Sequence, residues 1–246
     1  MTRKYNNSPI VEAVCEFQFD QSSSWDLTIP GLIYEKVQKT FPKRNQIAQI
    51  NFGIAVNTEA IGHQVGTQPL MQFLQDDGNA LIQVGPNLLT INQLAPYSSW
   101  QEFLPLIEQG IQAYKEAVSP QAVQRVALRY LNRLEFEHNI RLEDYLNFYP
   151  FLGKELPQEF GAFVLGVQIP CERLRDMLNL QLTSINSQTS NALSMILDIA
   201  YILSQPEKVM LDEILVWINT AHKRIEETFE ACITDQLRQK FKEVKG

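Results

Sequence analysis

Hydrophobic and polar residues alternate along a stretch near the start of the chain. The apolar positions are Val11, Ala13, Cys15, Phe17 and Phe19, and the polar positions are Glu12, Glu16, Gln18 and Asp20. A period of two places alternate side chains on opposite faces of an extended strand. We therefore expect residues 9–19 to form a half-buried strand with Glu12 and Glu16 on its polar face.

Helical periodicity and further apolar runs extend this picture to the rest of the chain. In the first half, the pattern predicts a helix over residues 32–41, strands over 47–56, 71–73, 81–84 and 88–94, a loop at 62–66 and a helix over 100–118. In the second half, it predicts strands over 124–136, 160–169, 177–185 and 193–203, a short helix over 142–148 and a long final helix from about residue 209. The sequence thus predicts an α+β fold.

The order strand, helix, antiparallel strands, helix occurs twice along the chain. We interpret this as a structural pseudo-repeat of two lobes, with an N-terminal lobe over 1–119 and a C-terminal lobe with a long terminal helix over 120–246. The order resembles that of the duplicated TATA-binding-protein-like lobe, in which helices back a curved sheet. This is an analogy of element order, and it implies nothing about function.

The expected strand at 124–136 carries a row of arginines. Arg125, Arg129 and Arg133 lie on one face, and the other face is apolar. If the two lobes meet about a pseudo-twofold axis, these arginines pair with Glu12 and Glu16 along a structural seam. The alternative is a binding site for an anion or a partner, in which Arg125, Arg129, Asn132 and Arg133 act as donors.

Motifs that signal catalysis are scarce. The spacing from Arg133 to His138 is similar to the Arg-x-x-x-x-His motif of HEPN-type ribonucleases, but those enzymes place it on a helical hairpin. Phosphate-binding, dinucleotide-binding and zinc-protease motifs are absent from the sequence, and its three histidines lie in different segments. We expect no catalytic residue, no metal and no cofactor, although carboxylates that meet only in the folded chain leave enzymatic activity open.

Composition narrows the classes of partner and location. The net charge of −7 disfavours general affinity for nucleic acid, because clustered lysine and arginine drive phosphate binding. No apolar run reaches the roughly 18 residues of a membrane-spanning helix. We expect no secretory signal, because residues 1–7 are followed by a strand-like pattern, and the three cysteines are widely spaced. A cytoplasmic protein is expected.

The segment Pro9-Ile10-Val11-Glu12-Ala13, with Asn7 before it and residues 129–133 later, resembles the N-terminal signature of a sporadically distributed, functionally uncharacterised family of prokaryotic proteins. The resemblance covers essentially the whole chain. It implies no established activity. The sporadic distribution of that family suggests mobile, defence-associated genes.

Three functions follow as hypotheses. The first is a non-enzymatic protein-binding or assembly module that uses a concave sheet face or the terminal helix, which would also form a homodimer. The second is a nucleic-acid or phosphate-ligand binding protein, or a nuclease, that uses Arg125, Arg129 and Arg133. The third is a small-ligand sensor with a cavity between sheet and helices.

Overall fold

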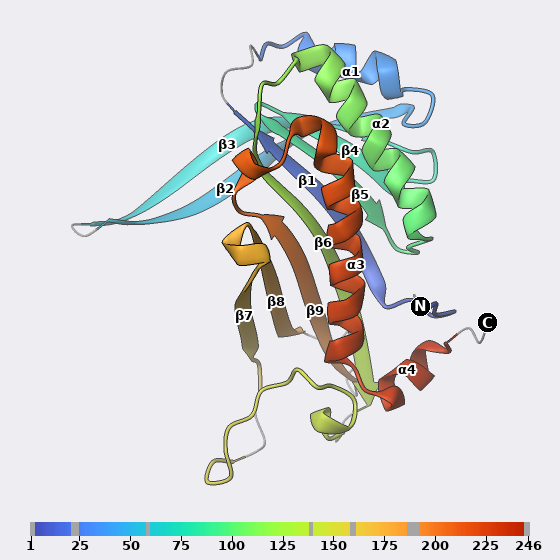
Figure 1. Cartoon of the computed structure of the whole chain (residues 1–246), viewed down its shortest axis with the longest axis vertical. Helices are drawn as coiled ribbons and strands as arrows, with labels where there is room; N and C mark the ends of the chain where they lie inside the picture. Colours follow the sequence, from blue (N-terminus) through green and yellow to red (C-terminus); the bar gives the residue numbers. More distant parts are fainter. Residues whose placement is uncertain are drawn as a thin grey trace. The chain divides into compact units, whose positions relative to one another are not determined.

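The structure is a computed structural model that describes residues 3–20, 25–57, 60–137, 140–157, 161–185 and 192–243. The described strands form a nine-stranded antiparallel sheet in the order β2-β3-β4-β5-β1-β6-β9-β8-β7 (Figure 1). The strands are β1 (Ile10–Phe19), β2 (Lys43–Asn57), β3 (Ala60–Leu74), β4 (Ala80–Gly85), β5 (Leu88–Leu94), β6 (Val123–Glu137), β7 (Val164–Cys171), β8 (Asp176–Ile185) and β9 (Ala192–Leu203). The helices are α1 (Ile29–Val37), α2 (Trp100–Val118), α3 (Ile214–Cys232) and α4 (Asp235–Phe241). The expected α+β class is confirmed.

The chain divides into two compact units, each assembled from separate stretches of sequence. Unit 1 contains residues 1–15, 94–99 and 125–246, and unit 2 contains residues 16–93 and 100–124. Strands β1 and β6 therefore each contribute residues to both units. The sequence-based division into 1–119 and 120–246 stays a prediction.

Unit 2 is held together by two helices and an antiparallel part of the sheet. Helices α1 and α2 contact each other, and α1 also contacts β3. The ring of Phe19 stacks on that of Tyr114 in α2 with centroids 4.3 Å apart. The large apolar side chains buried in this unit include Phe17, Ile33, Phe41, Phe73, Ile82, Leu89, Ile91, Phe103 and Ile107. Burial of such side chains is the main stabilising contribution to this unit.

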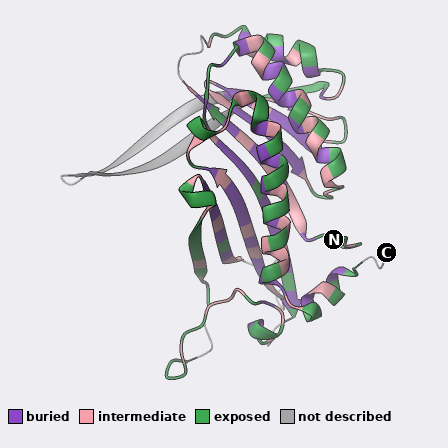
Figure 2. Ribbon diagram, in the orientation of Figure 1, coloured by how far each residue is buried: buried purple, intermediate pink, exposed green. Residues whose placement is uncertain are grey.

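In unit 1, helix α3 lies along β9 on one face of the sheet (Figure 1). Hydrogen bonds from His222 to Tyr130 and from Trp217 to Asp176 connect it to β6 and β8. The stripe of α3 that faces the sheet is Ile214, Trp217, Ile218, Ala221, Ile225 and Cys232. Opposite it lie buried side chains of the three strands, including Leu128, Tyr130, Leu134, Leu180, Leu182, Leu197, Ile199 and Tyr201. Figure 2 shows the contrast between these buried strands and the exposed strand β7. The long C-terminal helix expected from the periodicity is confirmed.

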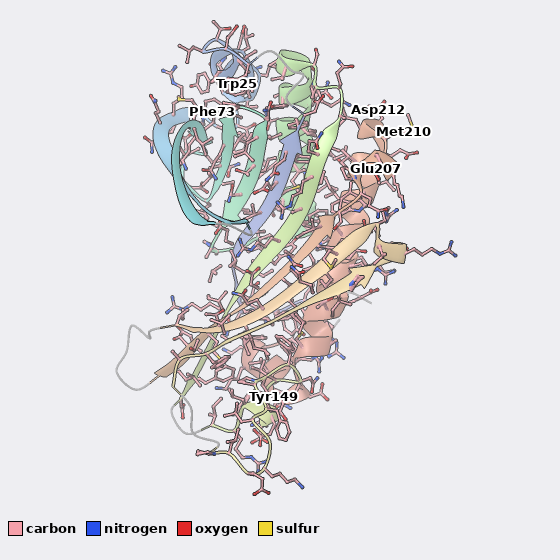
Figure 3. The ribbon with its side chains drawn as sticks, turned by 90° about the vertical axis from the view of Figure 1, so that its left-hand side faces the viewer. Trp25, Phe73, Tyr149, Glu207, Met210 and Asp212 are labelled. Atoms are coloured by element: carbon pink, nitrogen blue, oxygen red, sulfur yellow. The ribbon has the colours of Figure 1, made fainter. Side chains whose placement is uncertain are left out.

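Three expected element boundaries need correction. The loop expected at 62–66 is wrong, because β3 pairs with β2 in unbroken register over this region. Only the 3₁₀ turn Leu142–Asp144 forms where a short helix was expected. The long helix α3 begins at Ile214 rather than near residue 209, because the segment that holds Glu207, Met210 and Asp212 (Figure 3) forms two 3₁₀ turns separated by extended backbone at Met210.

Candidate functional site

Strand β6 carries its arginines on the side of the sheet that α3 does not cover. Along its length the even-numbered residues from Val126 to Phe136 are buried, whereas Arg129, Glu135 and Glu137 are exposed. The registers with β9 and β8 bring further side chains to the same side. We call this surface the open face; its exposed and half-buried residues include Arg125, Arg129, Leu131, Arg133 and Glu135 of β6, Ile196, Asp198 and Ile202 of β9, and Met177, Asn179, Gln181 and Thr183 of β8.

The centre of the open face is an ion pair between neighbouring strands. The Arg129 guanidinium donates two hydrogen bonds to Asp198, from Nε to Oδ1 over 2.8 Å and from Nη2 to Oδ2 over 2.5 Å. In the register Arg129 lies opposite Ala200 and Asp198 lies opposite Leu131, so the pair is diagonal. The Arg129 side chain remains 47% exposed and that of Asp198 14% exposed. This two-point geometry fixes the plane of the guanidinium.

A second carboxylate accompanies the next arginine along the strand. Arg133 Nε lies 2.9 Å from Glu135 Oε1, and the Arg133 backbone N–H donates to the carbonyl of Pro9 over 2.8 Å. Each of these two arginines therefore has an acidic neighbour of its own. The open face is thus a mixture of aliphatic groups and paired charges rather than a concentrated positive surface.

The predicted seam involves a strand that is a neighbour of β6 in the sheet. Glu12 and Glu16 are half-buried residues of β1, which lies between β5 and β6 in the strand order. Pairing of these carboxylates with the arginine row stays a prediction. In the structure Arg129 forms an ion pair with Asp198, a residue that the seam hypothesis did not include.

Asn132 and His138 do not extend the arginine row. Asn132 is 3% exposed and lies on the covered side of β6, where its Nδ2 donates to the carbonyl of Leu197 over 3.1 Å. The Asn132 amide therefore satisfies a backbone carbonyl of β9 on the covered side, and it is not a donor beside Arg129 on the open face. His138, the second residue of the ribonuclease-like spacing, lies outside the described residues.

The sequence analysis missed a buried carboxylate at the start of β8. Asp176 is fully buried and accepts hydrogen bonds from the Arg175 guanidinium, Tyr201 Oη at 3.1 Å and Trp217 Nε1 at 3.0 Å. The hydrogen bond to Asp176 raises the pKa of Arg175. Burial, reinforced by the Asp176 charge, raises the pKa of Tyr201. These donors join β8, β9 and α3, so the cluster stabilises the covered face.

A chain of polar side chains also crosses the covered face. Tyr97 Oη lies 3.2 Å from Tyr130 Oη, which lies 3.1 Å from Nδ1 of His222, and His222 Nε2 lies 3.3 Å from Glu226 Oε1. Burial raises the pKa values of both tyrosines well above their ordinary range. Tyr130 is 3% exposed. These four side chains therefore form an internal polar network that connects α3 to β6.

Comparison with known proteins gives no assignment. No protein-family model matches the chain, and no curated protein matches it. Within the described residues, no group of three or more His, Cys, Asp and Glu side chains is arranged to hold a metal ion. None of the helices found there has the length and apolar character needed to cross a membrane.

Proposed function

We propose that the chain is a non-enzymatic protein-binding module whose contact surface is the open face of unit 1. The observation that carries this proposal is the half-exposed Arg129, held in a fixed orientation by Asp198 among aliphatic side chains. Arginine and aliphatic groups that lie together without a covering helix have the composition of a protein interface. An oriented arginine also loses less conformational freedom on binding than a mobile one.

The pairing of charges favours a protein over a nucleic acid as the partner. A phosphate-binding surface gains affinity from cationic groups that displace counterions. On the open face, Asp198 and Glu135 already accompany Arg129 and Arg133, and the whole chain carries a net charge of −7. Binding of nucleic acid or of a phosphorylated ligand through the arginine row is the alternative proposal.

The proposal does not depend on the expected pseudo-repeat, family, location or role in defence. The pseudo-repeat with a TATA-binding-protein-like order stays a prediction, because the 3₁₀ turn Leu142–Asp144 follows β6 where helix α1 follows β1. The family resemblance, the cytoplasmic location and a role in defence stay predictions from the sequence.

The test is a comparison of two arginines of equal exposure on different faces. Arg129 is 47% exposed on the open face, and Arg224 is 48% exposed on α3, where it pairs with Glu172. Tagged wild-type protein, Arg129→Ala and Arg224→Ala are purified from the native host, and co-purified proteins and nucleic acids are quantified. We expect a stoichiometric protein with the wild type and Arg224→Ala, and about a 30-fold loss with Arg129→Ala, the size of an interface hot spot.

Two outcomes contradict the proposal. The first is a protein partner that Arg129→Ala retains as well as the wild type does. The second is nucleic acid or a phosphorylated metabolite that co-purifies with the wild type and is lost with Arg129→Ala, which establishes the alternative. Thermal unfolding of each variant verifies that the fold is intact before the recoveries are compared.

A further inference from the structure

Strand β7 is the last strand of the sheet on the side of unit 1, and it lacks the charged side chains that protect many such edges. Its sequence, Val-Leu-Gly-Val-Gln-Ile-Pro-Cys, contains no charged residue, and Val164, Val167 and Ile169 are 70%, 40% and 43% exposed. Natural edge strands carry lysines or other charges that prevent pairing with another chain. The opposite edge strand, β2, does begin with Lys43 and Arg44.

The hydrogen bonding of β7 shows which backbone groups point away from β8. The N–H of Ser184 donates to the carbonyl of Phe163 over 3.1 Å, and the register runs from Val164 opposite Thr183 to Cys171 opposite Asp176. Because backbone groups alternate in direction along a strand, residues 163, 165, 167 and 169 bond to β8, and residues 164, 166, 168 and 170 point outward. The outward N–H groups belong to Val164, Gly166 and Gln168.

Proline 170 fits this assignment. It belongs to the outward set, so its missing N–H removes no hydrogen bond to β8, which is the position that edge strands tolerate for proline. Pro170 also prevents pairing at one end of the strand. Within the part of the chain that the structure describes, this leaves a short, uncharged edge, on which the backbone N–H and C=O groups of Val164, Gly166 and Gln168 point away from β8.

We infer that β7 pairs with β7 of a second copy of this chain, antiparallel and centred on Gly166. In this register Gly166 lies opposite Gly166 and Val164 lies opposite Gln168, so the outward groups of the two copies form about six backbone hydrogen bonds. Residue 170 then falls beyond the paired segment. The two glycines at the twofold axis carry no side chain, and an isologous contact of this kind closes as a dimer.

The side chains of β7 favour the same partner. On the covered side Leu165 lies opposite Val167 of the second copy, which removes exposed aliphatic surface from water. Neither strand carries a charge, so the chain's net charge of −7 causes no direct repulsion at the contact. Helix α3 is a poorer dimer surface, because its outer side carries the ion pairs Lys223–Glu227 and Arg224–Glu227 and one large exposed apolar residue, Val216. This inference does not rest on the open face.

The first experiment is sedimentation equilibrium of the purified full chain over about 1–200 μM, the range in which strand pairing of modest area associates. We expect a monomer of 28.2 kDa at low concentration and a dimer at high concentration. Over the same range, amide hydrogen exchange at Val164, Gly166 and Gln168 slows as the dimer forms. A monomer at every concentration, or a dimer without this protection, overturns the inference.

Variants then separate the edge strand from the helix. Gly166→Pro and Gln168→Pro each remove an outward N–H from both copies and leave the bonds to β8 in place, so dimerisation weakens roughly 5- to 150-fold, as expected for two lost hydrogen bonds. Val216→Lys is the matched control on α3 and leaves dimerisation unchanged. Circular dichroism verifies folding, and the second proline variant replaces the first if that one does not fold. A dimer that resists both proline variants, or that Val216→Lys disrupts, overturns the inference.

Discussion

The two faces of the sheet in unit 1 each hold a carboxylate paired with an arginine, and the two carboxylates differ in burial. Asp176, on the covered face, is fully buried and accepts hydrogen bonds from Arg175, Tyr201 and Trp217. Asp198, on the open face, has Arg129 as its bidentate partner and keeps some contact with water. A buried charge must be satisfied entirely by the protein, whereas an exposed pair exchanges with water and with other partners. The first arrangement therefore stabilises the fold, and the second suits binding.

The largest effect is expected when the same substitution is made on each face. Asp176→Asn leaves Arg175 without its ionised partner and places an amide N–H₂ group among donors, so the free energy of unfolding falls by about 3–5 kcal/mol. Urea denaturation measures the loss. Asp198→Asn is the matched control and costs less than about 1 kcal/mol, since its partner stays hydrated. Equal losses for the two variants would remove the distinction between the faces.

A smaller effect is expected from single hydroxyl groups on the covered face. Tyr201→Phe removes one hydrogen bond to the ionised Asp176 and lowers the free energy of unfolding by about 1.5–3 kcal/mol. Tyr130→Phe removes contacts to Tyr97 and His222, which are not ionised carboxylates, and costs about 1 kcal/mol. The two midpoints in urea are compared directly. A larger loss for Tyr130→Phe would show that the Tyr97–Tyr130–His222–Glu226 chain, rather than Asp176, dominates the covered face.

The smallest effect is expected for the ion pair on the open face. A double-mutant cycle with Arg129→Ala and Asp198→Ala gives a coupling of about 0.2–1 kcal/mol, because Arg129 is half exposed and the pair is screened by salt. A second cycle, with Glu12→Ala and Arg129→Ala, tests the predicted seam. A coupling near zero in the second cycle, beside a measurable one in the first, would assign Arg129 to Asp198 alone.

Much of the local structure followed from periodicity. The alternation in β6 predicts its two faces, and helix α2 has the bounds 100–118 that its apolar stripe indicates. These elements obey local rules, because burial of one face is encoded within a few residues. The β2–β3 pairing was missed over 62–66, since glycines and polar residues there interrupt the alternation on which the prediction rests.

The site residues were harder to predict because they depend on register. Asn132 was predicted to act as a donor together with Arg129 and Arg133. It lies on the covered side instead, because even-numbered residues of β6 point to that side. Asp176 gains its role from residues 25 and 41 positions away, Tyr201 and Trp217. The sequence predicts a strand over 160–169 without its position in the sheet, and the exposure of β7 follows from its place at the end of the strand order. Strand order is a long-range property that composition does not encode.

The two ends of the described chain meet within unit 1, and this has a consequence for synthesis on the ribosome. The hydroxyl of Tyr5 donates to Glu230 over 2.6 Å, and the N–H groups of Asn6 and Asn7 donate to the carbonyls of Lys242 and Phe241. Residues made first therefore wait for residues made more than 220 positions later. At the usual translation rate this delay is about 10–50 s. During that time residues 5–7 lack the native partners that Glu230, Phe241 and Lys242 later provide, so this segment takes its final place only when the C-terminal part of the chain has been made.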